Sequence, residues 1–182
     1  MPRLVVAWGN MMRTLSVLLT GFFALLGAGV KAAPLAVGAP APRISAIDQE
    51  GKPVQFADVY AKGITLVYFY PKADTPGCTA EACSLRDSYE KLHASGLQII
   101  GVSRDSAGAQ KQFQEQNKLP FILVADTDGK VAEAFGVPMM ANRPLASRQS
   151  FIVKDGKIAW NSLKAQTKDS AEEVQKALDG LK

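Results

Sequence analysis

Residues 64–83 read ITLVYFYPKADTPGCTAEAC and join an apolar run to the start of a helix. The first seven of these residues are mostly β-branched or aromatic, a composition typical of a buried strand. Pro71 ends this strand because proline cannot donate a ladder hydrogen bond. Thr75 is a suitable N-cap and Pro76 a suitable first helical residue, so we expect a helix to begin there. Cys78 then lies in the first helical turn, where free N–H groups and the helix dipole favour a thiolate.

The rest of the chain alternates between apolar runs and helical patterns. Short alternating segments at 44–47 and 54–56 predict an N-terminal β-hairpin, and Asp155-Gly156 predicts a hairpin between the last two strands. Apolar runs predict further strands at 97–103, 121–125, 150–153 and 157–160. Helices are expected from Thr75 to about His93, after Asp105 and Ser106 as caps to about Lys118, at 131–135, and after Ser170 as a cap. The predicted fold is α/β and thioredoxin-like, with a mixed central sheet covered by helices on both faces.

Composition fits one globular domain and gives little support to nucleic-acid binding. The chain has 182 residues, of which 47% are hydrophobic and 21% charged. Its formal charge of +4 comes mostly from residues 1–32, which contain three basic residues and no acidic one. The remainder is nearly neutral and has no evident basic patch, so no nucleic-acid partner is expected.

The N-terminus resembles an export signal. Arg13 precedes an uncharged, mostly apolar segment at 14–30, and Val30-Lys31-Ala32 is a tolerable cleavage site. We therefore predict a signal peptide at 1–32 and an exported, periplasmic protein, with a membrane anchor that faces outside the cytoplasm as the alternative. An extended lead-in at 33–43 and one thioredoxin-fold domain at 44–182 would follow.

The two cysteines, Cys78 and Cys83, are spaced in a way that argues against a permanent disulfide. Residues five positions apart in an intact helix differ by roughly 140° and by about 8.6 Å between Cα atoms. A disulfide needs Cα atoms closer than about 7 Å. A transient disulfide, formed when the first helical turns unwind, resolves the conflict and favours a redox-active pair. Cys78 also begins an apolar stripe, expected to face the core, that continues through Ala82, Leu85, Tyr89 and Leu92.

Other cysteine chemistry has less support. A metal site needs three or four ligands, whereas the chain has one histidine, His93, which lies far down the same helix. The same distance disfavours a Cys–His hydrolase dyad. The Cys-x-x-Cys pair that marks disulfide oxidoreductases is absent.

The residues around Cys78 resemble the peroxiredoxin signature. Pro71, Thr75 and Cys78 have the spacing Pro-x-x-x-Thr-x-x-Cys of that family. Cys83, five positions after Cys78, is similar to the second cysteine of the Q-type, or bacterioferritin-comigratory-protein-like, subgroup.

More distant segments are similar to the same subgroup. They are Phe69 to Asp87, Gly101 to Ser106, and Arg148 to Phe151, and the last resembles the segment that contains the active-site arginine of the family. The resemblance extends from about Leu35 to the C-terminus.

The resemblance implies a role for each of these residues. Cys78 would be the peroxidatic nucleophile, which peroxide oxidises to a sulfenic acid, and Cys83 the resolving thiol, which forms an intramolecular disulfide with it. Arg148 would favour the Cys78 thiolate by its charge. Thr75 would cap the helix and donate its hydroxyl proton to the thiolate or peroxide.

Pro71 and Glu81 are expected to have lesser roles. Pro71 would shield the sulfenic acid from water and fix the loop. Glu81 is expected to serve only helix-start electrostatics, without a part in the chemistry.

The function implied by the resemblance is that of a thiol-dependent peroxidase in antioxidant defence. It would reduce hydrogen peroxide and organic hydroperoxides without haem, flavin or metal. Its partners would be the peroxide and a thioredoxin-like or other thiol reductant. A monomer would suffice, because the cysteine pair lies within one chain.

Two alternatives stay open at this point. The same fold and cysteines could serve an extracytoplasmic thiol–disulfide oxidoreductase that acts on proteins, although the missing Cys-x-x-Cys counts against it. The second alternative is a non-enzymatic binding module of thioredoxin fold, in which Cys78 is only a buried hydrophobic residue.

Overall fold

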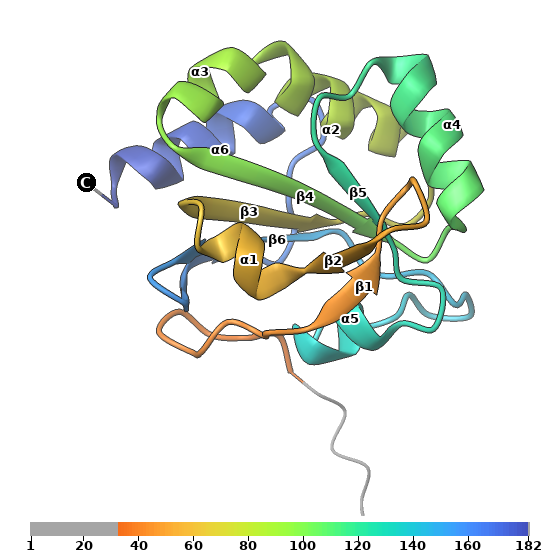
Figure 1. Ribbon diagram of the computed structural model, residues 1–182, viewed down its shortest axis with the longest axis horizontal. Helices are drawn as coiled ribbons and strands as arrows, with labels where there is room; N and C mark the ends of the chain where they lie inside the picture. The colour runs from red at the N-terminus through yellow and green to blue at the C-terminus, as the bar shows by residue number, and fades with distance from the viewer. Residues whose placement is uncertain (1–32, 182) are drawn as a thin grey trace, which may run out of the picture. The chain divides into compact units, whose positions relative to one another are not determined.

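Five strands form the main sheet in a computed structural model that describes residues 33–181 (Figure 1). The strand order is β5-β4-β3-β6-β7, with β3 paired in parallel to β4 and β4 to β5, whereas β6 and β7 are antiparallel. The bounds are β3 Ile64–Phe69, β4 Leu97–Ser103, β5 Ile122–Ala125, β6 Gln149–Lys154 and β7 Lys157–Ser162. The predicted mixed sheet is confirmed, and its parallel strands are joined by helical crossovers.

A separate two-stranded sheet precedes the main one. It is the expected N-terminal hairpin, formed by β1 (Ser45–Ile47) and β2 (Pro53–Gln55) in antiparallel pairing. Phe56, expected in the second strand, instead begins α1 (Phe56–Tyr60) and is fully buried. In the segment before the hairpin, Gly38 and Ala39 exchange backbone hydrogen bonds with Ile158, so this segment pairs with the outer edge of β7.

The remaining helices cover the sheet, and some of their ends differ from the predictions. Their bounds are α2 Pro76–Asp87, α3 Tyr89–Ala94, α4 Ala107–Asn117, α5 Lys130–Ala134 and α6 Ser170–Asp179. The single helix predicted up to His93 is interrupted at Ser88 (φ −102°, ψ 5°), a residue type that competes with helical hydrogen bonding. Ser170, predicted to cap the last helix, is buried inside it, and Asp169 occupies the N-cap.

The central strand separates two apolar cores. Leu66, Tyr68 and Tyr70 face α2, α4 and α6, whereas Val67 and Phe69 face α1 and α5. Figure 1 shows the same division, with α2, α3, α4 and α6 on one side of the sheet and α1 and α5 on the other. The strand is apolar on both faces because both faces are covered. The thioredoxin-like α/β fold is therefore confirmed.

The predictions for residues 1–32 lie outside the described residues. Within residues 33–181, no helix has the length and apolar character needed to cross a membrane.

Candidate active site

Cys78 lies in the first turn of α2, which follows the central strand after a connection formed by residues 70–75. Thr75 occupies the N-cap with extended backbone angles (φ −93°, ψ 146°), and Pro76 is the first helical residue, as expected. The Cys78 side chain is 1% exposed and belongs to the core that contains Ala82 and Leu85. The buried sulfur therefore belongs to the first turn of a helix, where the free N–H groups and the helix dipole favour a negative charge.

Arg148 reaches this sulfur from a distant part of the chain. Its Nη2 donates a hydrogen bond to the Cys78 Sγ over 3.2 Å. The sheet explains this approach, because Gln149, the first residue of β6, pairs with Phe69, the last residue of β3. The residue before β6 thus lies where β3 ends and α2 begins. The guanidinium places a fixed positive charge beside the sulfur.

Glu81 holds the other side of the guanidinium. Its side chain is fully buried, and its Oε2 accepts a hydrogen bond from Arg148 Nη1. Burial raises the pKa of Glu81 from 4.5 to about 8, although the Arg148 charge opposes this shift. The expectation that Glu81 serves helix-start electrostatics is wrong, because it lies one turn beyond the start and points inward. The sequence does contain a signal for this position. Cys78 and Glu81 are three residues apart, and residues with that spacing are neighbours on the surface of a helix.

Thr75 differs from the expectation in what its hydroxyl does. Its Oγ1 donates to the Lys72 carbonyl oxygen over 3.0 Å, and its side chain makes no capping hydrogen bond. A hydroxyl has one proton, so donation to the sulfur or to a peroxide requires this hydrogen bond to break. Pro71 follows the last strand residues and is partly exposed at the start of the connection to α2.

Asp105 anchors the connection between β3 and α2. Its Oδ2 accepts hydrogen bonds from the Ala73 N–H over 2.8 Å and from the Ser103 hydroxyl over 2.6 Å. The sequence assigned Asp105 to capping α4, but Ser106 alone is the N-cap and accepts from the Ala109 N–H over 3.3 Å. The carboxylate instead ties the loop that precedes Cys78 to the end of β4.

Cys83 lies on a different side of α2 from Cys78. It is partly exposed, and its Sγ lies 3.8 Å from the side-chain oxygen of Asn117, at the end of α4. Both cysteines of the chain are free thiols within one continuous helix. Five positions of regular helix put their Cα atoms about 8.6 Å apart, which is outside disulfide range.

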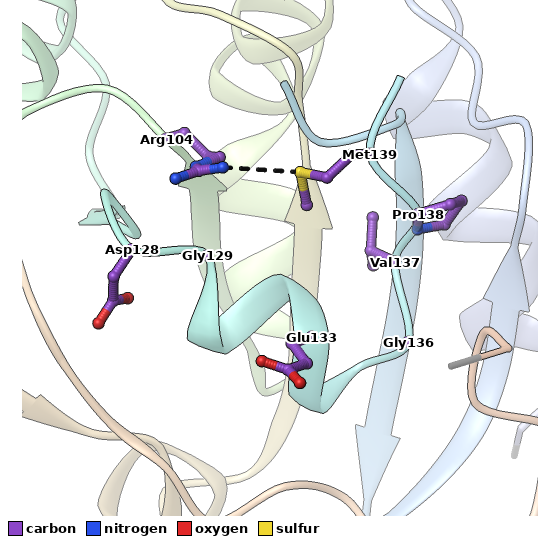
Figure 2. Close-up of a pocket in the computed structure, with 8 residues that line it drawn as sticks. All are labelled: Arg104, Asp128, Gly129, Glu133, Gly136, Val137, Pro138 and Met139. Carbon is purple, nitrogen blue, oxygen red and sulfur yellow. Dashed lines mark hydrogen bonds between the residues drawn. The ribbon is translucent and has the colours of Figure 1, made fainter. Parts of the chain in front are cut away.

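A pocket of about 280 Å³ has a lining that includes none of these residues. Figure 2 shows the residues that line it. In the view, Arg104 points toward the Met139 sulfur at one side of the pocket, with Glu133 on α5 at the other. Neither cysteine, nor Arg148, lines it. Among residues 33–181, no three His, Cys, Asp or Glu side chains are grouped so that they could hold a metal ion. The thiol and its guanidinium, rather than this cavity, therefore identify the candidate site.

A family model described as the AhpC/TSA family matches residues 37–161. The chain belongs to this family. One relative is the chloroplastic peroxiredoxin Q of Sedum lineare, which is 38% identical over 148 residues, or 80% of this chain and 78% of that protein. Some relatives are longer, and the chain covers 57% of the peroxiredoxin Q of Oryza sativa subsp. japonica.

Solved structures agree with this assignment. The crystal structure of peroxidoxin BcpB from Mycobacterium tuberculosis superposes with a TM-score of 0.76 at 28% identity, and covers 81% of this chain and 99% of that one. This peroxiredoxin is therefore a peroxidase of the oxidoreductase class, thiol-dependent and antioxidant in role. Structures of Xanthomonas campestris peroxiredoxin Q carry serine substitutions at two cysteines that are much further apart than five positions. A pairing of Cys78 with Cys83 is therefore not taken from these structures.

The names of the sequence relatives show that the prediction of an exported, periplasmic protein is wrong. The relatives from Sedum lineare, rice and Arabidopsis thaliana are named as chloroplastic proteins. The physical reason is that basic residues without acidic ones are common to secretory signals and to organelle transit peptides, so charge at residues 1–32 does not separate them.

Proposed function

We propose that this peroxiredoxin reduces hydrogen peroxide and organic hydroperoxides through Cys78. The thiolate attacks one peroxide oxygen, the O–O bond breaks, and the other oxygen leaves as water or alcohol after it takes a proton. The product is a sulfenic acid on Cys78. The observation that supports this role best is the 3.2 Å hydrogen bond from Arg148 to the sulfur at a helix start.

The residues around Cys78 have separate roles in stabilising charge, in positioning, in binding the peroxide and in limiting the access of water. Arg148 stabilises the thiolate and the negative charge that develops on the leaving oxygen. Glu81 is a positioning residue, because it binds Nη1 of the guanidinium whose Nη2 donates to the sulfur. Thr75 binds the peroxide after its hydroxyl turns from Lys72, and Pro71 restricts access of water to the sulfenic acid.

Cys83 completes the cycle as the resolving thiol. After the start of α2 unwinds, its sulfur attacks the Cys78 sulfenic sulfur, an S–S bond forms, the S–O bond breaks, and water leaves. An external dithiol, thioredoxin-like in its chemistry, then reduces the disulfide. Both cysteines belong to one chain, so a monomer can carry out every step.

Single-cysteine variants test these assignments. Cys78→Ser should reduce peroxide consumption to the background of the buffer, because the nucleophile is lost. Cys83→Ser should still consume about one equivalent of peroxide rapidly and then stop turning over with a dithiol reductant. Retained turnover in Cys78→Ser would exclude the assigned nucleophile, and wild-type turnover in Cys83→Ser would show that another thiol resolves.

A further inference from the structure

The C-terminal end of α4 packs against the middle of α2 at Cys83. Asn117, the last residue of α4, places its Oδ1 3.8 Å from the Cys83 sulfur. Its Nδ2 donates to the Phe113 carbonyl oxygen one turn earlier, over 2.9 Å. That second hydrogen bond fixes the amide, so its oxygen is held as the acceptor for the thiol proton. The sulfur of a residue on α2 is therefore bound to a side chain of another helix.

A second contact joins the same two places. Arg86 lies three positions after Cys83, and its Nη1 donates to the Asn117 backbone oxygen over 2.8 Å. This oxygen is one of the last carbonyls of α4, which lack partners inside that helix. The helix ends directly afterwards at Lys118, which has a left-handed conformation (φ 50°). Arg86 thus caps α4 from α2.

We infer that Asn117 and Arg86 form a latch that holds Cys83 in α2 and sets the rate at which it forms the disulfide with Cys78. The inference rests on the proposed role of Cys83 as the resolving thiol. Regular helix keeps the two sulfurs apart, so the chain must unwind before they meet. Both latch contacts oppose that movement, because they bind the part of α2 that contains Cys83 to a helix that does not need to move.

The latch acts on one chemical step only. In that step the Cys83 thiol gives up its proton, its sulfur bonds to the sulfenic sulfur of Cys78, and the displaced hydroxide takes a proton to leave as water. Asn117 touches neither the peroxide nor Cys78, so it is a positioning residue. While Cys83 is held, a second peroxide can convert the sulfenic acid to a sulfinic acid. Latch strength therefore also sets the sensitivity to excess peroxide.

The test compares Asn117→Ala with Gln116→Ala in single-turnover oxidation of the full chain by hydrogen peroxide. Gln116 is exposed on the same turn of α4, so its variant controls for a change of helix stability. Disulfide and sulfinic acid are measured by mass spectrometry after acid quench and thiol alkylation. In Asn117→Ala, the disulfide step, which does not depend on peroxide concentration, should be about fivefold faster, the equivalent of one ordinary hydrogen bond. The peroxide-dependent step should be unchanged, and less sulfinic acid should form.

Two more variants keep the result interpretable. Asn117→Asp retains an acceptor oxygen for the thiol but loses the donor to Phe113, so it should return the disulfide rate only part of the way toward that of the wild type. Arg86→Lys keeps the charge near Cys83 but loses the guanidinium geometry, and should also accelerate the step. An unchanged or slower disulfide step in Asn117→Ala overturns the latch, as does an equal acceleration in Gln116→Ala. Absence of the disulfide in the wild type overturns the role of Cys83 itself, which is a different result.

Discussion

Arg148 follows Cys78 by 70 positions and yet donates a hydrogen bond to its sulfur. Sequence reasoning could place Cys78 at a helix start because that placement depends on its neighbours, from Pro71 to Pro76. It could not place Arg148 from local pattern, and only the resemblance to peroxiredoxins pointed to it. The partner of Glu81 could not be predicted for a related reason: helical spacing gives the face on which a residue lies but not its partner from a distant part of the chain.

Replacement of Glu81 should change how stability depends on pH. Burial raises the pKa of this carboxyl from 4.5 to about 8. Between these values the unfolded chain releases the proton while the folded protein keeps it, so the free energy of unfolding falls as pH rises, by up to about 1.4 kcal/mol per pH unit. Glu81→Gln removes this titration and keeps an acceptor for Arg148. Urea unfolding of both proteins from pH 5 to pH 8 measures the difference.

The expected difference has a definite direction. The wild type should lose stability relative to Glu81→Gln as the pH rises through this window. A difference that stays constant from pH 5 to pH 8 would mean that Glu81 is ionised throughout, and that the Arg148 charge outweighs burial.

Among the helices and strands, some features follow from the local sequence, whereas others depend on packing between distant residues. Strand and helix types followed from apolar runs and turn residues, as at Asp155-Gly156, where both residues have positive φ (53° and 71°) and form the predicted hairpin turn. The short helix α1 could not be predicted, because the tertiary packing of Phe56 overrides weak local preferences. For the interruption at Ser88, the residue type itself was a local signal.

Close packing between β3 and β4 gives a prediction at this scale. Gly101 pairs with Tyr68 across the two strands. A Cβ on Gly101 would lie 2.7 Å from the Leu123 Cδ2 and 2.8 Å from the Tyr68 ring and hydroxyl. Gly101→Ala should therefore lower the free energy of unfolding by about 1–3 kcal/mol, because the fully buried ring cannot move aside freely.

Gly108 provides the matched control for this substitution. It lies in α4, and an added Cβ there would meet no atom within 4 Å. Gly108→Ala should leave stability unchanged or raise it by up to about 1 kcal/mol, since alanine loses less backbone entropy in a helix. Thermal and urea unfolding measure both variants. Equal effects of the two substitutions would show that the space around Gly101 relaxes.

At the scale of the whole molecule, the sheet order brings the catalytic parts together. Because β6 lies beside β3, the segment that ends at Arg148 meets the start of α2. The sequence predicted the mixed sheet but not its order, since pairing between distant strands leaves no periodic signal in either strand. The contact of Asn117 with Cys83, 34 positions apart, was inaccessible for the same reason.

Amide hydrogen exchange of reduced and peroxide-oxidised protein tests most directly whether Cys78 and Cys83 are kept apart by an intact α2. After one equivalent of peroxide, residues 76–87 of the wild type should lose protection, because the disulfide is incompatible with regular helix over these residues. Cys83→Ser, which can form the sulfenic acid but no disulfide, should keep its protection under the same treatment. Equal protection of residues 76–87 in reduced and disulfide-bonded wild-type protein would contradict the mechanism.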